Sequence, residues 1–477
     1  MSRESRGGGD LAYASVAELA VRIRSRTLSP VDLVDAVLDR IDRAKGLNAF
    51  ITVTADRARA RAADAVREIA AGRYRGPLHG IPVSLKDLID TRGVRTTCGS
   101  RVLAGRVPTA DATVTARLEA AGAVLIGKTA LHEFAYGVTT NNPHYGPTRN
   151  PWGPDRIPGG SSGGSGAAVA AGLGPVSIGT DTGGSIRIPA ALCGVVGLKP
   201  TYGRVSRHGV FPLAWTLDHL GPLARTVEDA ALVLQAIAGP DPHDSTTLGQ
   251  RVPEFAEALS RPLAGLRVGV LADDFHQEMA EDVRTAFEEA LAVLQSLGLE
   301  PAPVQFPRAA EASVAQAAVI MSEAASVHER WLRDRPGEYG ADVLARLRRG
   351  QFLSATQYLR AQRVRSLVQD EVAGLFRSCV ALVCPTTASG AALISDETVV
   401  IRGARTPVRD SMTRLTRLWN FTGLPAISVP CGFSADGFPI GLQVIGPAMD
   451  EVILLAIAHA FEQATPWHTR RPPEAAV

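Results

Sequence analysis

The amino-acid sequence predicts an α/β fold in which helices pack on both faces of one β-sheet. Short apolar runs that are typical of buried strands alternate with longer stretches of helical periodicity. No internal repeat or low-complexity linker divides the 477 residues, and 45% of them are hydrophobic, which is ample for a large core. Strands that alternate with helices favour a single sheet covered on both sides.

The individual elements follow from local signals. Ser15 and Glu18 form a capping-box pattern, and Ser29-Pro30 begins a second helix with proline at its first position. Further helices are predicted at residues 55–72, 113–121, 167–171, 226–237, 278–298, 310–333 and 355–375. Strands are predicted at residues 81–85, 124–126, 176–178, 266–271, 380–384, 426–429 and 441–445. Residues 238–265 and 385–410 are rich in turn formers and are predicted to be loops over the core.

The domain organisation is predicted to be simple. Residues 1–10 are polar and glycine-rich and are predicted to be a disordered tail, and residues 11–477 to be a single domain. The beginning of the chain has no apolar core typical of a signal peptide, and no apolar run is long enough to span a membrane. The sequence therefore predicts a cytoplasmic protein.

Composition narrows the function classes. The formal net charge is only +2, so nothing demands a nucleic acid, an anionic membrane or an acidic partner. The five cysteines are an odd number without a CxxC pair, which argues against a disulfide framework or a zinc site. We expect no nucleic-acid or membrane partner, no metal and no cofactor.

Lysine is unusually rare in this chain. Of the 50 basic residues only four are lysines, namely Lys45, Lys86, Lys128 and Lys199. Arginine stays protonated in proteins, whereas a buried lysine can lose its proton and act as a base. A retained lysine is thus a candidate catalytic base, although chance or a packing need for a thinner side chain would also explain it.

A nucleotide-binding motif and a hydrolase motif each match part of the chain in residue pattern but not in predicted structure. Residues 122–129 fit the GxxxxGK[ST] phosphate-loop pattern, but the four intervening residues, Ala-Val-Leu-Ile, read as a strand rather than a flexible loop. Residues 160–164 fit the GxSxG nucleophile elbow with Ser162 as nucleophile, with His459 and His468 as late candidate partners. That motif needs a strand directly before the serine, and residues 155–158 read as a loop.

A third interpretation couples two serines to a lysine. Small residues before Ser185 allow backbone N–H groups to converge on a negative oxygen. Lys86 ends an apolar strand, so we expect it to be partly buried with a depressed pKa. A glycine- and serine-rich run is more often a flexible loop, but this one continues directly into an apolar helix and strand.

Three separated motifs resemble the amidase signature family. They are GGSSGGS at residues 159–165, GTDTGGSIR at residues 179–187 and GVVGLKPT at residues 194–201. Lys86 precedes Ser161 by 75 positions, Ser161 precedes Ser185 by 24, and residues 423–430 and 437–443 resemble the family's C-terminal motifs. The resemblance covers residues 15–470 and implies a large central mixed β-sheet with helices on both faces.

The resemblance also implies a Ser–cis-Ser–Lys triad and its supporting residues. Ser185 is the expected nucleophile, Ser161 the relay on a cis peptide bond and Lys86 the base. The backbone N–H groups of residues 182–185 are the expected oxyanion hole (Thr182, Gly183, Gly184 and Ser185). Asp181, Arg187 and Ser162 are expected to support this loop, and Lys128 and Lys199 to be structural.

The resemblance implies a hydrolase that cleaves C–N bonds through an acyl-enzyme. The main interpretation is a stand-alone amidase acting on linear amides, and also on anilides, esters or carbamates, as a monomer or homodimer with a small-molecule substrate. Its pocket is expected within the more variable regions 238–265 and 310–420 and along residues 136–142, 211–215, 319–331 and 415–421. The alternative is the glutaminase component (the A subunit) of a tRNA-dependent amidotransferase complex, and a non-catalytic binding protein on the same fold is a third possibility.

Overall fold

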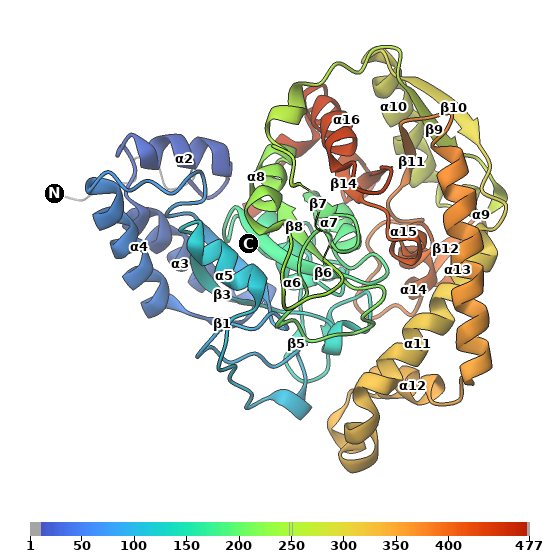
Figure 1. The fold of residues 1–477 in the computed structure, drawn as a ribbon, viewed down its shortest axis with the longest axis horizontal. Helices are drawn as coiled ribbons and strands as arrows, with labels where there is room; N and C mark the ends of the chain where they lie inside the picture. The colour runs from blue at the N-terminus through green and yellow to red at the C-terminus, as the bar shows by residue number, and fades with distance from the viewer. Residues whose placement is uncertain (1–10, 248, 250, 475–477) are drawn as a thin grey trace.

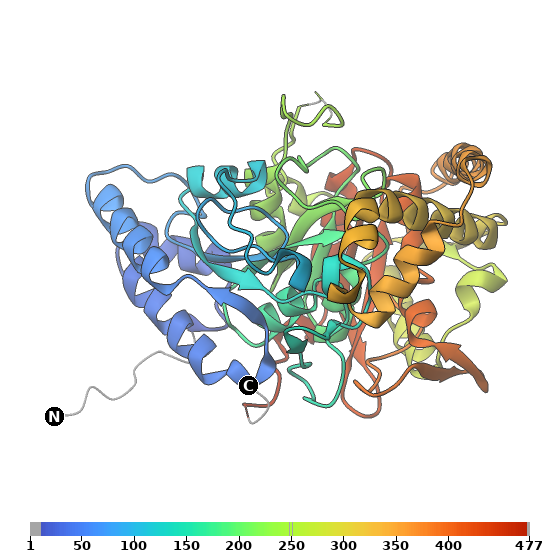
Figure 2. The same ribbon diagram turned by 90° about the horizontal axis from the view of Figure 1, so that it is seen from below.

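The computed structural model describes residues 11–247, 249 and 251–474, so the predicted disordered tail at residues 1–10 lies outside the described residues. Within that part of the chain, one mixed sheet of eleven strands runs through the molecule in the order β1-β3-β2-β6-β8-β7-β14-β15-β11-β9-β10. These strands are β1 (Phe50–Val53), β2 (Pro82–Lys86), β3 (Val124–Thr129), β6 (Val176–Asp181), β7 (Val196–Lys199), β8 (His219–Ala224), β9 (Arg267–Leu271), β10 (Glu300–Val304), β11 (Ala381–Pro385), β14 (Ala426–Phe433) and β15 (Pro439–Ile445). Helices cover both faces of the sheet, as Figures 1 and 2 show together, so the predicted fold class is confirmed.

The helices of the described residues are α2 (Val16–Arg24), α3 (Pro30–Arg43), α4 (Ala55–Ala70), α5 (Thr113–Ala120), α6 (Gly163–Ala170), α7 (Arg187–Cys193), α8 (Val227–Ile237), α9 (Asp274–Gln277), α10 (Glu281–Ser296), α11 (Ala309–Asp334), α12 (Ala341–Gly350), α13 (Ala355–Leu375), α14 (Val408–Thr413), α15 (Arg417–Thr422) and α16 (Glu451–Gln463). Helices such as α3 and α10 bury one apolar side, whereas α6 and α7 are buried on every side. In Figure 1, α2, α3 and α4 form one end of the molecule and α11, α12 and α13 form the other. The predicted capping box of Ser15 and Glu18 begins α2, and Ser29 caps α3 with Pro30 at its first turn.

The central strands place the chemistry-bearing segments side by side. β2 pairs in parallel with both β3 and β6, and β6 pairs antiparallel with β8. Every residue of β2, β3, β6 and β8 is buried. Because the carboxyl ends of β2 and β6 lie at the same edge, Lys86 comes close to the segment that follows Asp181.

The structure differs from the prediction at residues 385–410. This segment is not wholly a loop, because it contains a hairpin of β12 (Thr398–Ile401) and β13 (Ala404–Pro407) and the start of α14. Only Ile401 of β12 is buried and no residue of β13 is, so the hairpin has no alternating buried face that a period of two could reveal.

Two further properties bear on the chemical class of the protein. All five cysteines are free and buried. Among residues 11–247, 249 and 251–474, no helix combines the length and hydropathy needed to cross a bilayer.

Candidate active site

Lys86 is the last residue of β2 and is fully buried. Its Nζ donates to Ser161 Oγ at 2.7 Å and to Thr180 Oγ1 at 2.8 Å. Burial lowers the pKa of Lys86 to about 7, against the opposing effect of the carboxylates of Asp181 and Asp218. A large fraction of this amine is therefore neutral near pH 7, and the neutral form can accept a proton from a hydroxyl.

The segment that carries Ser161 is tightly packed. The peptide bond between Gly160 and Ser161 is cis, as the resemblance implied. Ser161 is fully buried, and its carbonyl accepts the N–H of His132 at 3.1 Å. A Cβ on Gly163 would lie 2.2 Å from Thr140 Oγ1, so no larger residue fits there. The glycines of this run serve close packing rather than flexibility.

Ser185 lies beside the Ser161 segment. The backbone N–H of Ser162 donates to the carbonyl of Ser185 at 3.2 Å, which ties the two segments together. Ser185 is 7% exposed, whereas Ser161 and Ser162 are fully buried, so Ser185 is the serine that a substrate can reach. No hydrogen bond joins the hydroxyls of Ser161 and Ser185 in the described chain, and the relay between them stays a prediction.

The carboxylate of Asp181 holds the expected oxyanion loop in place. Asp181 Oδ1 accepts the N–H of Gly184 at 2.7 Å, and Oδ2 accepts the N–H of Ile186 at 3.1 Å. The N–H of Gly184 is therefore occupied by Asp181, in contrast to the role predicted from the resemblance. The N–H groups of Thr182, Gly183 and Ser185 remain as the predicted donors to an oxyanion.

Asp181 and Arg187 form a fully buried ion pair beneath this loop. Arg187 Nη2 lies 2.9 Å from Asp181 Oδ1, and Arg187 Nε donates to Oδ2 at 3.0 Å. Although burial alone would raise it, the pKa of Asp181 is held below its usual range by Arg187. The other N–H groups of Arg187 reach Asn420 Oδ1 and Gln443 Oε1. Asn420 and Gln443 lie in segments named from the sequence, but their contact with Arg187 was not predicted, because it crosses more than two hundred residues.

Ser162 has a structural role. Its Oγ donates to the carbonyl of Thr180 at 3.1 Å, and it directly precedes α6 with no strand before it. The geometry of a nucleophile elbow is therefore absent from the described residues 155–162. Ser162 supports the loop by joining it to β6.

The other two buried lysines are also structural. Lys128 lies within β3, and its Nζ donates to the carbonyl of Ile89 and to Thr96 Oγ1. Residues 124–129 are a strand rather than a phosphate-binding loop, as the sequence indicated. Lys199 Nζ donates to the carbonyls of Pro200 and Leu424 and so joins β7 to the start of β14.

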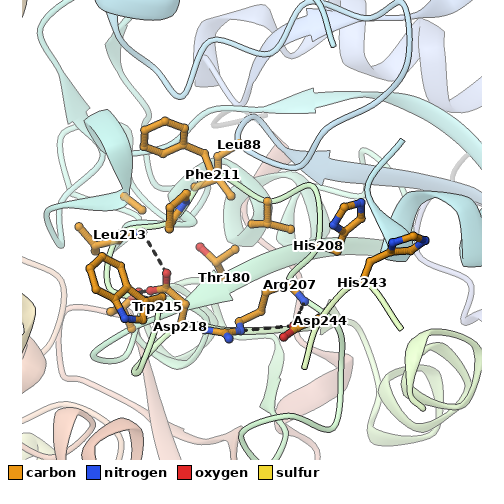
Figure 3. A pocket seen from close by; sticks show the side chains of 14 residues that line it. Leu88, Thr180, Arg207, His208, Phe211, Leu213, Trp215, Asp218, His243 and Asp244 are labelled. Carbon is orange, nitrogen blue, oxygen red and sulfur yellow. Dashed lines mark hydrogen bonds and ion pairs between the residues drawn. The ribbon is translucent and has the colours of Figure 1, made fainter. Parts of the chain in front are cut away.

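A cavity of about 210 Å³ lies beside the segment of residues 180–182. Thr180 and Thr182 contribute to its wall, and Figure 3 shows Thr180, Asp218 and Trp215 around the same space. The cavity is lined by Leu88, Ala135, Thr180, Thr182, Arg207, His208, Val210, Phe211, Pro212, Leu213, Trp215, Asp218, His243 and Asp244. Of the four segments expected to form the pocket, residues 211–215 contribute its wall. Asp218, which carries no signal in the sequence, lies at its base.

The sequence model of the amidase family matches residues 32–455. The chain belongs to the amidase family. The match covers Lys86, Ser161, Ser185 and the buried ion pair, and it confirms the resemblance drawn from the three motifs.

Relatives of this amidase-family chain cover nearly its whole length. It is 42% identical over 483 residues to the A subunit of glutamyl-tRNA(Gln) amidotransferase from Thermosynechococcus vestitus, with 96% of this chain and 99% of the relative covered. A solved structure from a vestigial protein complex, described as revealing the origins of an s-triazine catabolic enzyme, is 41% identical with a TM-score of 0.91, covering 94% and 98% of the two chains. The A subunit of the glutamyl-tRNA(Gln) amidotransferase from Thermotoga maritima is 35% identical with a TM-score of 0.80, and 96% of each chain is covered.

These relatives overturn one prediction. The sequence predicted a monomer or homodimer that acts on a small molecule without any nucleic-acid partner. The relatives that match over 96% of the chain are subunits of an enzyme whose name includes a tRNA. The prediction was wrong because a small net charge does not exclude assembly with a partner subunit that contacts the nucleic acid.

Proposed function

We propose that this protein cleaves an amide C–N bond through an acyl-enzyme on Ser185 and works as the ammonia-releasing subunit of a larger enzyme. The observation that carries the chemistry is the 2.7 Å hydrogen bond between Lys86 Nζ and Ser161 Oγ in a fully buried site. The pKa of about 7 supports a lysine that is partly neutral at the pH of the reaction.

The proposed mechanism uses one proton path in both directions. Lys86 accepts a proton from Ser161 as Ser161 accepts one from Ser185, and Ser185 then attacks the substrate carbonyl. Backbone N–H groups of the loop after Asp181 stabilise the oxyanion. Ser161 returns the proton to the leaving nitrogen, which departs as ammonia from a primary amide. Water releases the acyl group by the same path.

The names of the relatives support a role within a complex. The amidotransferase subunits match this chain from end to end, and the s-triazine relative also comes from a protein complex. We propose that ammonia passes from Ser185 to a partner subunit that transfers it to an amino acid on tRNA. We place this reaction in the cytoplasm, as the sequence predicts.

A cluster of arginines near the oxyanion loop favours a substrate that carries a carboxylate. The guanidinium carbons of Arg409 and Arg346 lie 5.4 Å and 5.8 Å from the centre of the buried Tyr136 ring. A Cβ on Gly183 would lie 3.8 Å from the Cβ of Arg417. Burial, together with repulsion from Arg409, lowers the pKa of Arg417 to about 10. An anionic group would relieve this repulsion and offer an acceptor to the Tyr136 hydroxyl, which has no hydrogen-bond partner among the described residues. Glutamine has such a carboxylate.

A second candidate is the same chemistry on an apolar amide, anilide, ester or carbamate. The observation that favours it is the apolar wall of the cavity, formed by side chains such as Phe211, Leu213 and Trp215. An aryl group would be removed from water there and would stabilise binding by about 25 cal/mol per Å² buried.

A substrate comparison tests the proposal. Ammonia or amine release is measured as kcat/KM for glutamine, for glutamine whose carboxylate is converted to an amide, and for an aryl anilide. We expect glutamine to be preferred, and Arg409→Gln to raise its KM about tenfold while Arg402→Gln, on the exposed hairpin, leaves it unchanged. Preference for the anilide would favour the second candidate. Turnover that persists in Ser185→Ala would overturn both.

A further inference from the structure

The carboxylate of Asp218 joins two loops that face the active site. Its Oδ1 accepts the hydroxyl of Thr182 at 2.6 Å, and its Oδ2 accepts the N–H groups of Leu213 at 2.9 Å and Ala214 at 3.1 Å. Figure 3 shows this carboxylate at the cavity, beside Trp215. Thr182 belongs to the expected oxyanion loop, whereas Leu213 and Ala214 belong to the loop that forms the cavity wall.

The geometry also links Asp218 to the base. Thr180 and Thr182 both line the cavity, and Thr180 Oγ1 accepts the N–H of Lys86. Thr180 lies in β6 and Thr182 lies one residue beyond its end, and both contribute to the same cavity wall. The wall of this cavity therefore carries one hydroxyl bonded to Lys86 and another bonded to Asp218.

Few other charges act on Asp218 across this space. Arg207 is a cation that lowers the pKa of Asp218, and it is itself paired with Asp244 at 3.6 Å. Asp181, the other carboxylate that acts on Lys86, is neutralised by Arg187. Asp218 is therefore the acid with no ion-pair partner among the described groups that face Lys86.

We propose that Asp218 is a positioning residue of this site, one that fixes Thr182 of the oxyanion loop against the Leu213–Ala214 wall. It contacts no reacting atom and acts through its neighbours. A substrate bound in the cavity would contact the same wall. Asp218 therefore links substrate binding to the position of the oxyanion loop. The inference rests on the proposed acyl-enzyme at Ser185.

The pH response follows from the direction of two shifts. Burial raises the pKa of Asp218 to about 6, so the carboxylate is ionised at neutral pH and protonated in mild acid. Its negative charge raises the pKa of Lys86, which burial lowers. Removing the charge should therefore lower the pKa of Lys86 further and move the acid limb of activity to lower pH.

The decisive experiment compares Asp218→Asn with two substitutions of Thr182 in the full-length protein. Asp218→Asn should lower kcat about 10- to 100-fold, because the oxyanion donors lose their placement. It should also move the acid limb of kcat/KM to lower pH by roughly half a unit or more. Thr182→Val should lower kcat but move the limb less than Asp218→Asn does, because the carboxylate stays in place although it loses a hydrogen bond that lowers its pKa. Thr182→Ser keeps the hydroxyl and should restore kcat.

The controls separate this inference from the proposed function. Asp436→Asn, at an exposed carboxylate remote from the cavity, should leave both kcat and the acid limb unchanged. Labelling of the wild type but not of Ser185→Ala by a fluorophosphonate tests the acyl-enzyme alone. The positioning role would be overturned if Asp218→Asn kept wild-type kcat and an unmoved limb, or if Thr182→Val equalled the wild type. If Asp218→Asn does not fold, the Val and Ser variants of Thr182 decide the question.

Discussion

Arg187 and Asp181 form a bidentate ion pair that is completely buried beside the loop of residues 182–186, with Nη2–Oδ1 and Nε–Oδ2 separations of 2.9 Å and 3.0 Å. Both side chains are 0% exposed. The pair is an anchor for the loop, because Asp181 also accepts the N–H groups of Gly184 and Ile186. The planar fork of arginine suits this task better than the point charge of lysine.

The first prediction concerns Arg187→Lys. The ammonium keeps the charge but has only three donors, so at least two buried acceptors lose their partner, at about 1–3 kcal/mol each. Urea unfolding should show this loss, and kcat should fall because the oxyanion loop is released. Arg106→Lys is a matched control, because Arg106 also binds both carboxylate oxygens of one aspartate, Asp90, but is 32% exposed. It should cost less than about 1 kcal/mol. Equal losses in the two variants would contradict the anchoring role.

The second prediction concerns Lys86. Because its pKa is about 7, the neutral base forms as the pH rises, and kcat/KM should increase through an acid limb near pH 7. Lys86→Arg keeps a cation that does not deprotonate, so activity should fall at least 10²-fold, which is the lower range for loss of a general base, while the fold persists. Circular dichroism checks the fold, and a pH–rate profile checks the limb.

Lys45→Arg is the control for this prediction. The Lys45 side chain is 75% exposed and pairs with Asp42, so the variant should leave the profile unchanged. An active Lys86→Arg protein near neutral pH would rule out Lys86 as the base.

The sequence predicts some of the strands around the site but not all of them. β2, β3 and β6 are predictable within a few residues because each is a short apolar run between clear turn signals. β8 is not, because its sequence, HLGPLA, has Gly-Pro at the centre and reads as a turn. Pro222 is nevertheless paired with Ile178 of β6, whereas the pairing of β8 with β7 ends at Leu223.

The residues proposed for the triad stand out in the sequence because their motifs are local. The contacts of Asp218, Asn420 and Gln443 do not, because they join strands and loops far apart in the chain. The arginine cluster is equally hidden: Arg346 and Arg409 lie on separate helices and share only the ring of Tyr136. A chain with so many arginines offers no signal that singles these two out.

The third prediction concerns Gly164, in the first turn of α6. A Cβ there would lie 2.5 Å from the backbone N and O of Ala130 and 2.6 Å from the carbonyl of Ala49. Backbone atoms cannot move aside as a flexible side chain can, so Gly164→Ala should destabilise the fold by about 1–3 kcal/mol or more and displace Ser161. Gly374→Ala, inside α13 with nothing within 4 Å of the added Cβ, should instead stabilise by about 0.5–1 kcal/mol. Unfolding midpoints in urea measure both, and a neutral Gly164→Ala would show that the α6 contact can relax.

The fourth prediction concerns two buried carboxyl groups, Asp229 and Glu462, that lie between α8, α16 and the start of α2. Asp229 Oδ1 accepts the N–H of Ala17 at 3.3 Å, and Glu462 Oε2 accepts the N–H of Val227 at 2.8 Å. Their other oxygens have no hydrogen-bond partner among the described residues. Burial raises the pKa of Asp229 to about 7 and that of Glu462 to about 8.

These raised values fix the sign of the pH dependence. Above about pH 4 the unfolded chain releases these protons while the folded chain keeps them, so the free energy of unfolding falls as pH rises toward about 8. Each group contributes a slope of up to about 1.4 kcal/mol per pH unit. In Glu462→Gln the free energy of unfolding should therefore fall less steeply between pH 5.5 and 8.5. This variant should be more stable than the wild type near pH 8.5. Glu329→Gln, on the exposed side of α11, should retain the wild-type slope. Urea unfolding at three pH values decides the matter, and parallel slopes for the wild type and Glu462→Gln would show that the proton is not held in the folded state.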